Sequence, residues 1–235
     1  MLQQLKFLTA GESHGKGLSG ILEGFPAGVP LSESLIATDL ARRQMGHGRG
    51  GRMTIEKDHA EILSGLRHGY TLGSPIALWI QNRDWENWKQ DKMAHNAPLN
   101  PVPEVTLPRP GHADLAGTQK FGFTDIRNVL ERSSARETAM RVAMGAVCRS
   151  LLKELGIEIF SHVIQIGPVK SGTKVDQSDI EINQIADASD VRCLDEKAAK
   201  AMIKHIDETR KKGDSIGGVF EVLAAGLPPG LGSYT

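Results

Sequence analysis

One stretch of the sequence joins a helix start to charged and hydroxyl side chains: Glu131-Arg132-Ser133-Ser134-Ala135-Arg136-Glu137-Thr138. Ser134 precedes Glu137 by three residues, the capping-box spacing that satisfies two backbone N–H groups where a helix begins. A helix N-terminus favours negative charge, and Arg132 and Arg136 flank the two hydroxyls, so the stretch is suited to holding a phosphate. The same residues also fit a structural interpretation, a capped core helix with two solvated arginines.

Two histidines lie on glycine-containing turns, where rigid scaffolds often carry acid–base groups. His14 stands in Gly11-Glu12-Ser13-His14-Gly15, and His112 stands in Arg109-Pro110-Gly111-His112-Ala113-Asp114. Such a histidine suits a general acid or base. Each turn taken alone also fits an exposed surface histidine without a chemical role. The two turns together, with an arginine three residues before His112, favour the chemical interpretation.

A third feature is the basic, glycine-rich segment Arg42-Arg43-Gln44-Met45-Gly46-His47-Gly48-Arg49-Gly50-Gly51-Arg52. The planar guanidinium group of arginine binds phosphate and carboxylate well, often through two parallel hydrogen bonds. A basic glycine-rich segment can also be a nucleic-acid-binding tail, but strand-like segments at 61–66 and 74–81 follow it closely. We therefore interpret it as an ordered clamp for several negative charges.

The familiar cofactor and nucleophile motifs are missing from the sequence. It has no P-loop, no G-x-G-x-x-G after a strand, no H-E-x-x-H and no G-x-S-x-G. It has no Cys/His metal set, so no metal is expected. The candidate functional groups that the sequence does contain are two turn histidines, arginines on glycine loops and a helix start suited to phosphate. They indicate a small substrate with several negative charges and a proton transfer, hence a lyase or transferase acting on a phosphate ester.

Regular elements on either side of these residues must position them. We predict strands at 5–9 and 18–23 around the His14 turn, and a helix from the cap Ser32 to about Gln44. The segment 83–108 has no clear periodicity and reads as a surface excursion or lid, with an insertion of no chemical role as the simpler interpretation. Asp114 is predicted to cap a short helix over 115–121, and the long helix after Ser134 to end at Gly156.

Beyond the long helix we predict a strand at 156–166 and a polar, peripheral segment at 170–194. Asp195 should begin an amphipathic helix that ends near Gly213, and residues 215–225 read as a strand. No repeat or linker divides the chain, so we expect a single domain over residues 1–235.

Composition limits the classes of function. The 235 residues contain 28 Lys+Arg and 28 Asp+Glu, so overall charge predicts no attraction to nucleic acid or to membranes. The two cysteines, Cys148 and Cys193, have no metal or redox spacing and read as thiols in a reducing compartment. Without an apolar run long enough to span a bilayer and without a signal peptide, a soluble cytoplasmic protein is expected.

Five stretches resemble the signature segments of the chorismate synthase family. They are the Gly11–Gly15 turn, Arg109–Asp114, Arg132–Thr138, Gly213-Asp214-Ser215-Ile216-Gly217-Gly218 and Gly226-Leu227-Pro228-Pro229-Gly230-Leu231-Gly232. They occur in order along essentially the whole chain, which makes the resemblance far more specific than a single motif. It implies an anti-1,4-elimination of phosphate from 5-enolpyruvylshikimate-3-phosphate to chorismate, in aromatic amino-acid biosynthesis, with reduced FMN and no net redox change.

The resemblance also implies roles for individual residues. His14 would protonate the departing phosphate, and His112 would lie beside the reduced flavin. The phosphorylated substrate would be bound by Ser13, Arg43, Arg49, Arg109 and Arg136. Arg43 and Arg49 also match positions assigned to NADPH, a possible reductant of the flavin, and Arg132, Ser133 and Ser134 match an FMN-binding triplet.

The fold implied by the family is α+β, a β-α-β sandwich in which antiparallel sheets enclose a helical layer, assembled as a homotetramer. Family members continue well past 235 residues, and their later part supplies a Lys-Pro-Thr-Ser-Ser-like flavin stretch and a catalytic Asp in an Arg-x-Asp motif. Neither stretch is present in this sequence. We therefore expect the N-terminal two thirds of the family's fold, incomplete at the C-terminus.

Two alternatives stay open. One is a truncated, non-catalytic fragment that binds a flavin or another anion. The other is a nucleic-acid-binding module that uses the segment from Arg42 to Arg52, although the neutral charge balance and the lack of basic helices argue against it.

Overall fold

The computed structural model describes residues 5–48, 57–90, 92–98, 100–175 and 181–231. The chain divides into two compact units: residues 1–43 with 55–148, and residues 44–54 with 149–235. The single domain predicted for residues 1–235 stays a prediction.

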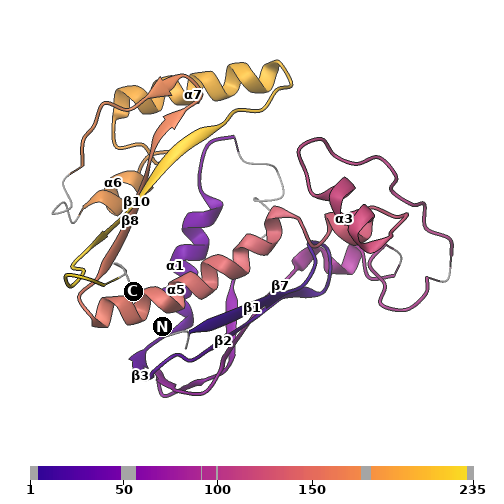
Figure 1. The fold of residues 1–235 in the computed structure, drawn as a ribbon, viewed down its shortest axis with the longest axis horizontal. Helices are drawn as coiled ribbons and strands as arrows, with labels where there is room; N and C mark the ends of the chain where they lie inside the picture. The colour runs from indigo at the N-terminus through magenta and orange to yellow at the C-terminus, as the bar shows by residue number, and fades with distance from the viewer. Residues whose placement is uncertain (1–4, 49–56, 91, 99, 176–180, 232–235) are drawn as a thin grey trace. The chain divides into compact units, whose positions relative to one another are not determined.

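The first unit is built on an antiparallel four-stranded sheet (Figure 1). In spatial order its strands are β1 (Lys6–Ala10), β2 (Gly17–Glu23), β7 (Ile76–Gln81) and β4 (Ala60–Ser64). A smaller antiparallel sheet contains β3 (Ala27–Pro30), β6 (Tyr70–Leu72) and β5 (Leu66–Arg67). The strands predicted around the His14 turn are therefore confirmed, and that turn is the connection between β1 and β2.

Alternating apolar side chains give the large sheet its buried face. Every second residue of β2 and β7 points into the core, and Leu18, Leu22, Ile76, Leu78 and Ile80 are all fully buried. Gly20 lies between Leu18 and Leu22 on that face, and a Cβ there would stand 2.4 Å from the methyl carbon of Met144. The missing side chain at Gly20 thus lets a helix lie directly on the sheet.

That helix is α5 (Thr138–Glu154), which Figure 1 shows running along the sheet. Its Met140, Ala143 and Val147 are fully buried, as the spacing of three and four residues predicted. Gly156 adopts a φ of +71° just beyond its end, as expected of the glycine that closes a helix. The predicted helix after Ser32 is α1 (Glu33–Gln44), and the Ser32 hydroxyl accepts a hydrogen bond from Leu35 N.

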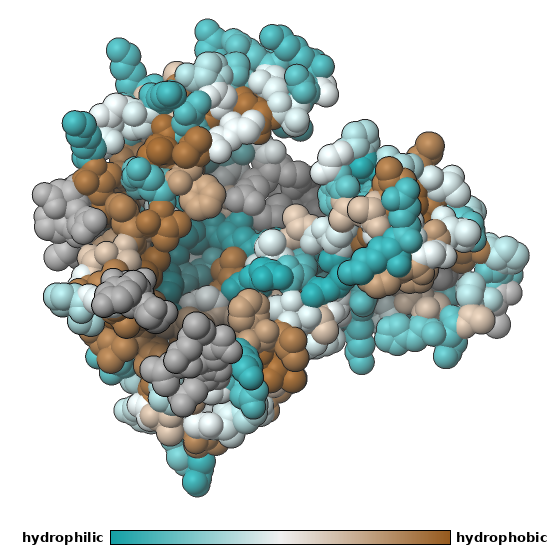
Figure 2. Space-filling model, viewed as in Figure 1, coloured by the Kyte–Doolittle hydropathy of each residue, from teal (hydrophilic) through white to brown (hydrophobic). Residues whose placement is uncertain are grey.

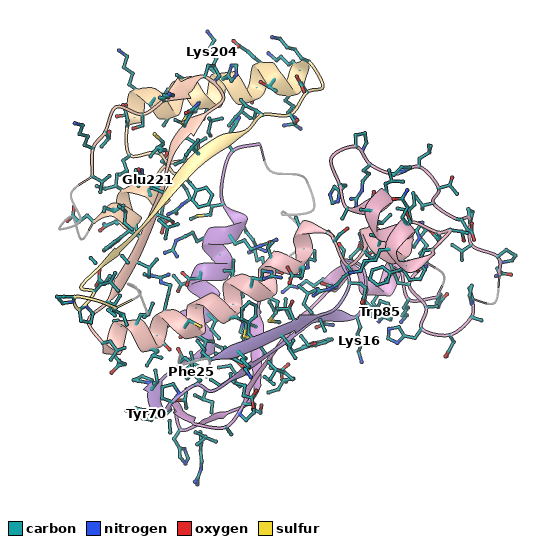
Figure 3. The ribbon with its side chains drawn as sticks, in the orientation of Figure 1. Lys16, Phe25, Tyr70, Trp85, Lys204 and Glu221 are labelled. Carbon is teal, nitrogen blue, oxygen red and sulfur yellow. The ribbon has the colours of Figure 1, made fainter. Side chains whose placement is uncertain are left out.

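Short helices occupy the rest of the first unit. They are the 3-10 turn η1 (Arg83–Asn87), α3 (Asp114–Phe121), α4 (Arg127–Leu130) and the 3-10 turn η2 (Ala135–Glu137), which leads into α5. Figure 3 labels Lys16, at the start of β2, and Trp85, on η1, near the same end of the sheet. Backbone hydrogen bonds connect them, since Asn82 N donates to Lys16 O and Trp85 N donates to Asn82 O.

The second unit has an antiparallel sheet in the order β10 (Gly218–Ala225), β8 (Glu158–Ile166), β9 (Val169–Lys170). Two helices accompany it, α6 (Ile182–Asp187) and α7 (Glu196–Lys211). Asp195 caps α7 by accepting a hydrogen bond from Ala198 N, as predicted. Val219, Phe220 and Val222 of β10 are exposed, and Figure 2 shows hydrophobic surface over this part of the unit.

One prediction for this unit is wrong. Residues 170–194 were expected to be peripheral because they are polar and acidic. Within the described part of this segment, however, Ile182 and Ala186 of α6 are buried, and Val191 and Cys193 belong to the core that packs on α7. A few apolar residues among many charges suffice to anchor the segment. In both units, all the strand pairings that the structure describes are antiparallel, and the fold is α+β as predicted.

Candidate active site

The turn between β1 and β2 carries Ser13 and His14. Gly11 begins it with a φ of +110°, and a Cβ at this position would stand 2.3 Å from Gly17 O, so only glycine fits. The turn is then attached to the segment after α4, because Ser13 N donates to Glu131 O at 3.0 Å. Residues 118 positions apart in the sequence are therefore held together by a backbone hydrogen bond.

The His14 ring is held at its edge and on its face. Both carboxylate oxygens of Glu131 lie 3.0 Å from His14 Nδ1, and Oε2 also accepts a hydrogen bond from His14 N at 2.8 Å. On its face the ring stacks on Trp88, with centroids 3.9 Å apart and planes inclined by 25°. The Glu131 side chain is only 2% exposed, and that of His14 is 21% exposed. The imidazole is thus oriented while one part of it reaches the surface.

Glu131 carries a negative charge at neutral pH despite its burial. Burial alone raises the pKa of this carboxyl group. The hydrogen bonds from the ring and backbone of His14, with the charges of His14 and Arg127, outweigh that effect and lower the pKa below its usual value. A buried carboxylate in contact with an imidazole is a common arrangement for fixing the ring of an acid–base histidine.

Asn82 supports the same turn from the end of β7. Its side-chain amide donates to Glu12 O at 3.0 Å and to Gly15 O at 2.8 Å, while its Oδ1 accepts from Arg136 Nε at 2.9 Å. Because Asn82 is 1% exposed, these bonds are made without competition from water. One amide thus couples the His14 turn to an arginine of the helix start.

Arg136 and Arg43 share a buried carboxylate. Arg136 Nη1 lies 2.5 Å from Asp58 Oδ1, and Arg43 Nη1 lies 3.6 Å from Asp58 Oδ2. The Asp58 side chain is 1% exposed. Arg43 also donates to Ala135 O at 2.9 Å and to Thr138 Oγ1 at 3.0 Å, which places it against the start of α5. Two positive charges therefore stand beside one negative charge at this helix start.

The helix start differs from its prediction in one respect. The Ser134 hydroxyl accepts from Arg136 N at 3.3 Å, as a cap should, and also donates to Ser13 Oγ at 3.1 Å. The predicted return bond from Glu137 is wrong. The Glu137 carboxylate accepts from Thr9 Oγ1 at 2.6 Å and from Arg141 Nε at 2.8 Å. A hydrogen bond from strand β1 and an ion pair with Arg141 thus replace the local capping bond.

His112 lies on a second corner with different surroundings. Arg109 Nη2 donates to His112 Nδ1 at 3.2 Å, while Nε and Nη2 of Arg109 bind the two oxygens of Asp114 at 2.8 and 2.9 Å. The side chains of Arg109 and His112 are 44% and 36% exposed, so the predicted exposed corner is confirmed. The hydrogen bond from Arg109 lowers the pKa of Asp114 to about 2, although burial of the carboxyl group opposes this.

The predicted cap of the following helix is wrong. The N-cap residue of α3 is Ala113, which makes no side-chain cap hydrogen bond, and Asp114 is the first helical residue. Its carboxylate is taken up by Arg109 instead, because a bidentate bond to a guanidinium is stronger than a bond to a neutral backbone N–H.

The two corners are electrostatically connected. The hydrogen bond that Arg109 donates to Asp114 raises the pKa of Arg109 against the opposing effect of burial, and the charges of Asp114 and Glu131 add to the rise. The carboxylate that binds His14 therefore also acts on the arginine that binds His112.

A pocket of about 430 Å³ opens beside the second corner. Its lining includes Ala113 and Gly117 of the α3 region, Phe121, Arg132 and Ser133. Small-molecule sites usually measure about 300–1,000 Å³ and combine apolar walls with a few polar groups. Ser133 Oγ is buried and has no hydrogen-bond partner among the residues that the structure describes. An unsatisfied buried hydroxyl in such a pocket is suited to a ligand that accepts or donates one hydrogen bond.

Arg132 is oriented by the strand that precedes the His14 turn. Its Nη2 donates to Thr9 O at 2.9 Å, and its Nη1 donates to Gly11 O at 3.3 Å. The structure thus brings Ser13, His14, Arg132, Ser134 and Arg136 together and places Arg43 beside them. Arg49 lies outside the described residues.

Four residues of this site were not predicted from the sequence: Asp58, Asn82, Trp88 and, as a partner of His14, Glu131. Trp88 follows η1 in the segment thought to be an insertion without a chemical role, yet it covers the His14 ring. The available signals were weak: Asn82 is a polar residue directly after a strand, and Glu131 stands next to the Arg-Ser-Ser triplet.

Two searches of the described residues were negative. No group of three or more His, Cys, Asp or Glu side chains among them could hold a metal ion. Within the same residues no helix is both long enough and apolar enough to cross a membrane.

Comparisons with known proteins agree closely. A family model described as chorismate synthase matches residues 5–235. The chorismate synthase of Moorella thermoacetica is 59% identical over 230 residues, which cover 98% of this chain and 59% of that protein. The chorismate synthase of Listeria innocua is 53% identical over 237 residues, with coverages of 98% and 60%. A solved structure titled "Crystal Structure of Chorismate Synthase" has a TM-score of 0.78 and 46% identity, covering 98% of this chain and 61% of that one. The chain thus spans about 60% of the length of the curated relatives it matches.

Proposed function

The chain belongs to the chorismate synthase family, and on this premise we propose that it forms much of the active site of a carbon–oxygen lyase acting on a phosphate ester. The proposed reaction converts 5-enolpyruvylshikimate-3-phosphate to chorismate and phosphate. The C–O bond to phosphate breaks, a proton is lost from the ring, and one double bond forms, so the substrate undergoes no net oxidation. The reaction belongs to the shikimate pathway of aromatic amino-acid biosynthesis.

His14 is the proposed acid for the departing phosphate. The single observation that carries this role is its ring, held by the buried carboxylate of Glu131 and stacked on Trp88. An oriented imidazole can give up a proton without first being ordered, and acid–base groups of this kind contribute about 10²–10⁴-fold to rates. Ser13 is proposed to bind the substrate beside His14. The hydrogen bond that its hydroxyl accepts from Ser134 connects it to the helix start.

The arginines are proposed to hold the anionic groups of the substrate. Arg109 offers an exposed guanidinium at the His112 corner. Arg136 and Arg43 bring two guanidinium groups to the start of α5, where both lie beside the carboxylate of Asp58. Each charge-assisted hydrogen bond is worth about 1.5–3 kcal/mol, so three or four contacts suffice for micromolar binding. Arg49 is proposed as a further substrate ligand.

FMN is the proposed cofactor, and the pocket beside the second corner is its proposed site. Ser133, with its buried hydroxyl, and Arg132 line that pocket. With Ser134 they would hold the flavin, and His112 would stabilise the protonation state of its reduced form. Reduced FMN, when bound, supplies an electron and takes it back. Arg43 and Arg49 would bind NADPH if the enzyme reduces its own flavin.

Two further properties are proposed from the family alone: a cytoplasmic location and assembly as a homotetramer. The substrate is a small phosphorylated molecule, and neither a nucleic acid nor a membrane is expected as a partner.

The decisive experiment measures chorismate formation under anaerobic conditions with chemically reduced FMN and 5-enolpyruvylshikimate-3-phosphate. It compares the 235-residue chain with a version that continues as the curated relatives do. Turnover by the longer version supports the proposal, and absence of chorismate contradicts it.

The second candidate is a non-catalytic fragment that binds flavin or another anion. It is favoured by the chain's span of about 60% of its relatives' length. FMN binding by the 235-residue chain without turnover, followed by fluorescence quenching, is the result expected for it.

A further inference from the structure

Glu131 holds the His14 turn with both its backbone and its side chain. Its carbonyl oxygen accepts from Ser13 N, and its carboxylate accepts from both the backbone and the ring of His14. The residue immediately follows α4, whose Val129 is buried, so its position is set by a packed element. Such a residue can determine how the imidazole is oriented and which ring nitrogen carries a proton.

The charged groups around His14 make the carboxylate the main influence on its ring. Arg127 lies with its guanidinium carbon 5.9 Å from the Trp88 ring, and Lys92 Nζ lies 4.7 Å from the same ring. Both of these distances are to the tryptophan ring, whereas Glu131 is in direct contact with Nδ1 of the imidazole. A carboxylate can only accept, so Nδ1 must carry a hydrogen in this contact.

We propose that Glu131 is a positioning residue for the reaction, which keeps the proton of His14 on Nδ1 so that Nε2 is the nitrogen that protonates the departing phosphate. The inference rests on the proposed function for the identity of the proton acceptor. In the step, the Nε2–H bond breaks, the phosphate oxygen gains that proton, and the ring remains neutral with its Nδ1–H bound to Glu131. No electron is transferred in this step.

Glu131→Gln is a sharp test because an amide has one oxygen where the carboxylate has two. The shorter bond in this structure joins Glu131 Oε2 to His14 N. A glutamine that keeps this bond brings its NH₂ group to the position of Oε1, 3.0 Å from Nδ1, where NH₂ can only donate and so competes with the retained oxygen, which also lies 3.0 Å from Nδ1. Nδ1 then becomes an acceptor, and the ring can take a second proton only by breaking that contact.

The matched control is Glu137→Gln. It is the same substitution six positions along the chain, in a carboxylate that binds Thr9 and Arg141 rather than His14. Glu131→Asp is the second variant, because it keeps the charge and moves the carboxylate back by one methylene group.

The first measurement uses ¹⁵N signals of the histidine rings in the 235-residue chain, which need no substrate. In the wild type and in Glu137→Gln we expect His14 Nδ1 to stay protonated in the neutral ring. In Glu131→Gln we expect the proton to move to Nε2, and in Glu131→Asp we expect it to remain on Nδ1. An unchanged His14 signal in folded Glu131→Gln overturns the proposal.

The second measurement is turnover in a full-length version. Glu131→Gln should reduce kcat by about 10²-fold or more with little change in KM, and by no more than His14→Ala, whose expected loss is about 10²–10⁴-fold. In a His14→Ala background the same substitution should add no further loss, because a residue acting through His14 has nothing left to act on. An equal loss in both backgrounds means that Glu131 is only structural and overturns the proposal.

The two proposals fail in different ways. If no version forms chorismate, the proposed function fails, but the ring signals still decide whether Glu131 sets the proton of His14. If chorismate forms and Glu131→Gln matches the wild type, the role of Glu131 fails and the function stands.

Discussion

The corners that carry His14 and His112 look alike in the sequence, yet they are supported in opposite ways. His14 faces a carboxylate, which accepts a hydrogen bond from its Nδ1, whereas His112 faces a guanidinium, which donates one to its Nδ1. The neutral rings therefore carry their hydrogens on different nitrogens, Nδ1 in His14 and Nε2 in His112. Two similar sequence motifs thus present two imidazoles that differ in which ring nitrogen carries the hydrogen.

The residues that hold the two histidines also differ in how deeply they are buried. The His14 turn is supported by a chain of buried polar contacts: Asn82 binds the turn and Arg136, and Arg136 binds Asp58. His112 is supported by one ion pair, in which the arginine side chain is 44% exposed and only the carboxylate is buried. A proton donor that must meet a leaving group needs a fixed position, whereas a group beside a bound cofactor is positioned in part by that cofactor. The contrast agrees with the two proposed roles.

The largest expected effect is on turnover. In a full-length version, His14→Ala and His112→Ala should each lower kcat by about 10²–10⁴-fold, the usual contribution of an acid–base group. Only His112→Ala should also weaken FMN binding, measured by fluorescence titration. Circular dichroism checks that both variants fold, and a wild-type rate in either one removes its proposed role.

The next effect concerns stability and compares the two arginines. Arg136→Ala leaves Asp58, a buried carboxylate, without its main partner and should lower the free energy of unfolding by about 3 kcal/mol or more. Arg109→Ala should cost less, about 2 kcal/mol, because Asp114, although buried, keeps its hydrogen bond from the backbone N of residue 109 and water can enter the exposed space that the guanidinium leaves. Urea denaturation of the 235-residue chain measures both. Equal losses would show that the two corners do not differ in depth of support.

The lowered pKa of Asp114 gives the second corner a measurable effect of pH on stability. The pKa of Asp114 is lowered to about 2 in the folded chain, below its value of about 4 in unfolded peptides. This carboxylate therefore stabilises the fold above pH 4, and its contribution is lost as the pH falls toward 2. Between pH 4 and pH 2 the melting temperature of the wild type should fall more steeply than that of Asp114→Asn. Parallel curves would contradict the strength assigned to the Arg109–Asp114 pair.

The smallest effect concerns the ring that covers His14. Trp88→Ala should cost about 1 kcal/mol of stability, the usual value of an aromatic stack, and should expose the imidazole to water. The control is Trp85→Ala, whose ring lies tilted 5.7 Å from His95 and does not contact His14. Ring ¹⁵N signals of His14 should change only in the first variant. A change of the same size in both would indicate that the whole segment has moved.

Local chemistry explains which parts of the fold could be predicted. Ser32, Asp195 and Gly156 close or open helices through contacts within four residues, and each was predicted correctly. Asp114 and Glu137 also had the right spacing for a cap, but charged partners took both carboxylates. The capping rule fails at these two positions because an arginine five or four residues away binds the carboxylate more strongly than the backbone N–H does.

The site was predictable only in part, for a related reason. Ser13, His14, Arg132 and Arg136 were found because their motifs are continuous in the sequence. Glu131, Trp88, Asn82 and Asp58 support them through pairings that span about 50 to 120 residues, which no periodicity reveals. The division into two compact units was not predicted either, because no composition change or linker marks it.

Strand β10 has a practical consequence for anyone preparing this chain. It lies at the edge of its sheet in the described structure, and its Val219, Phe220 and Val222 are exposed. An edge strand that has a partner on one side only and carries exposed apolar side chains is a template on which further chains can add. Purified samples of the 235 residues should therefore form oligomers as the concentration rises, and replacing Val222 with lysine is the simplest remedy.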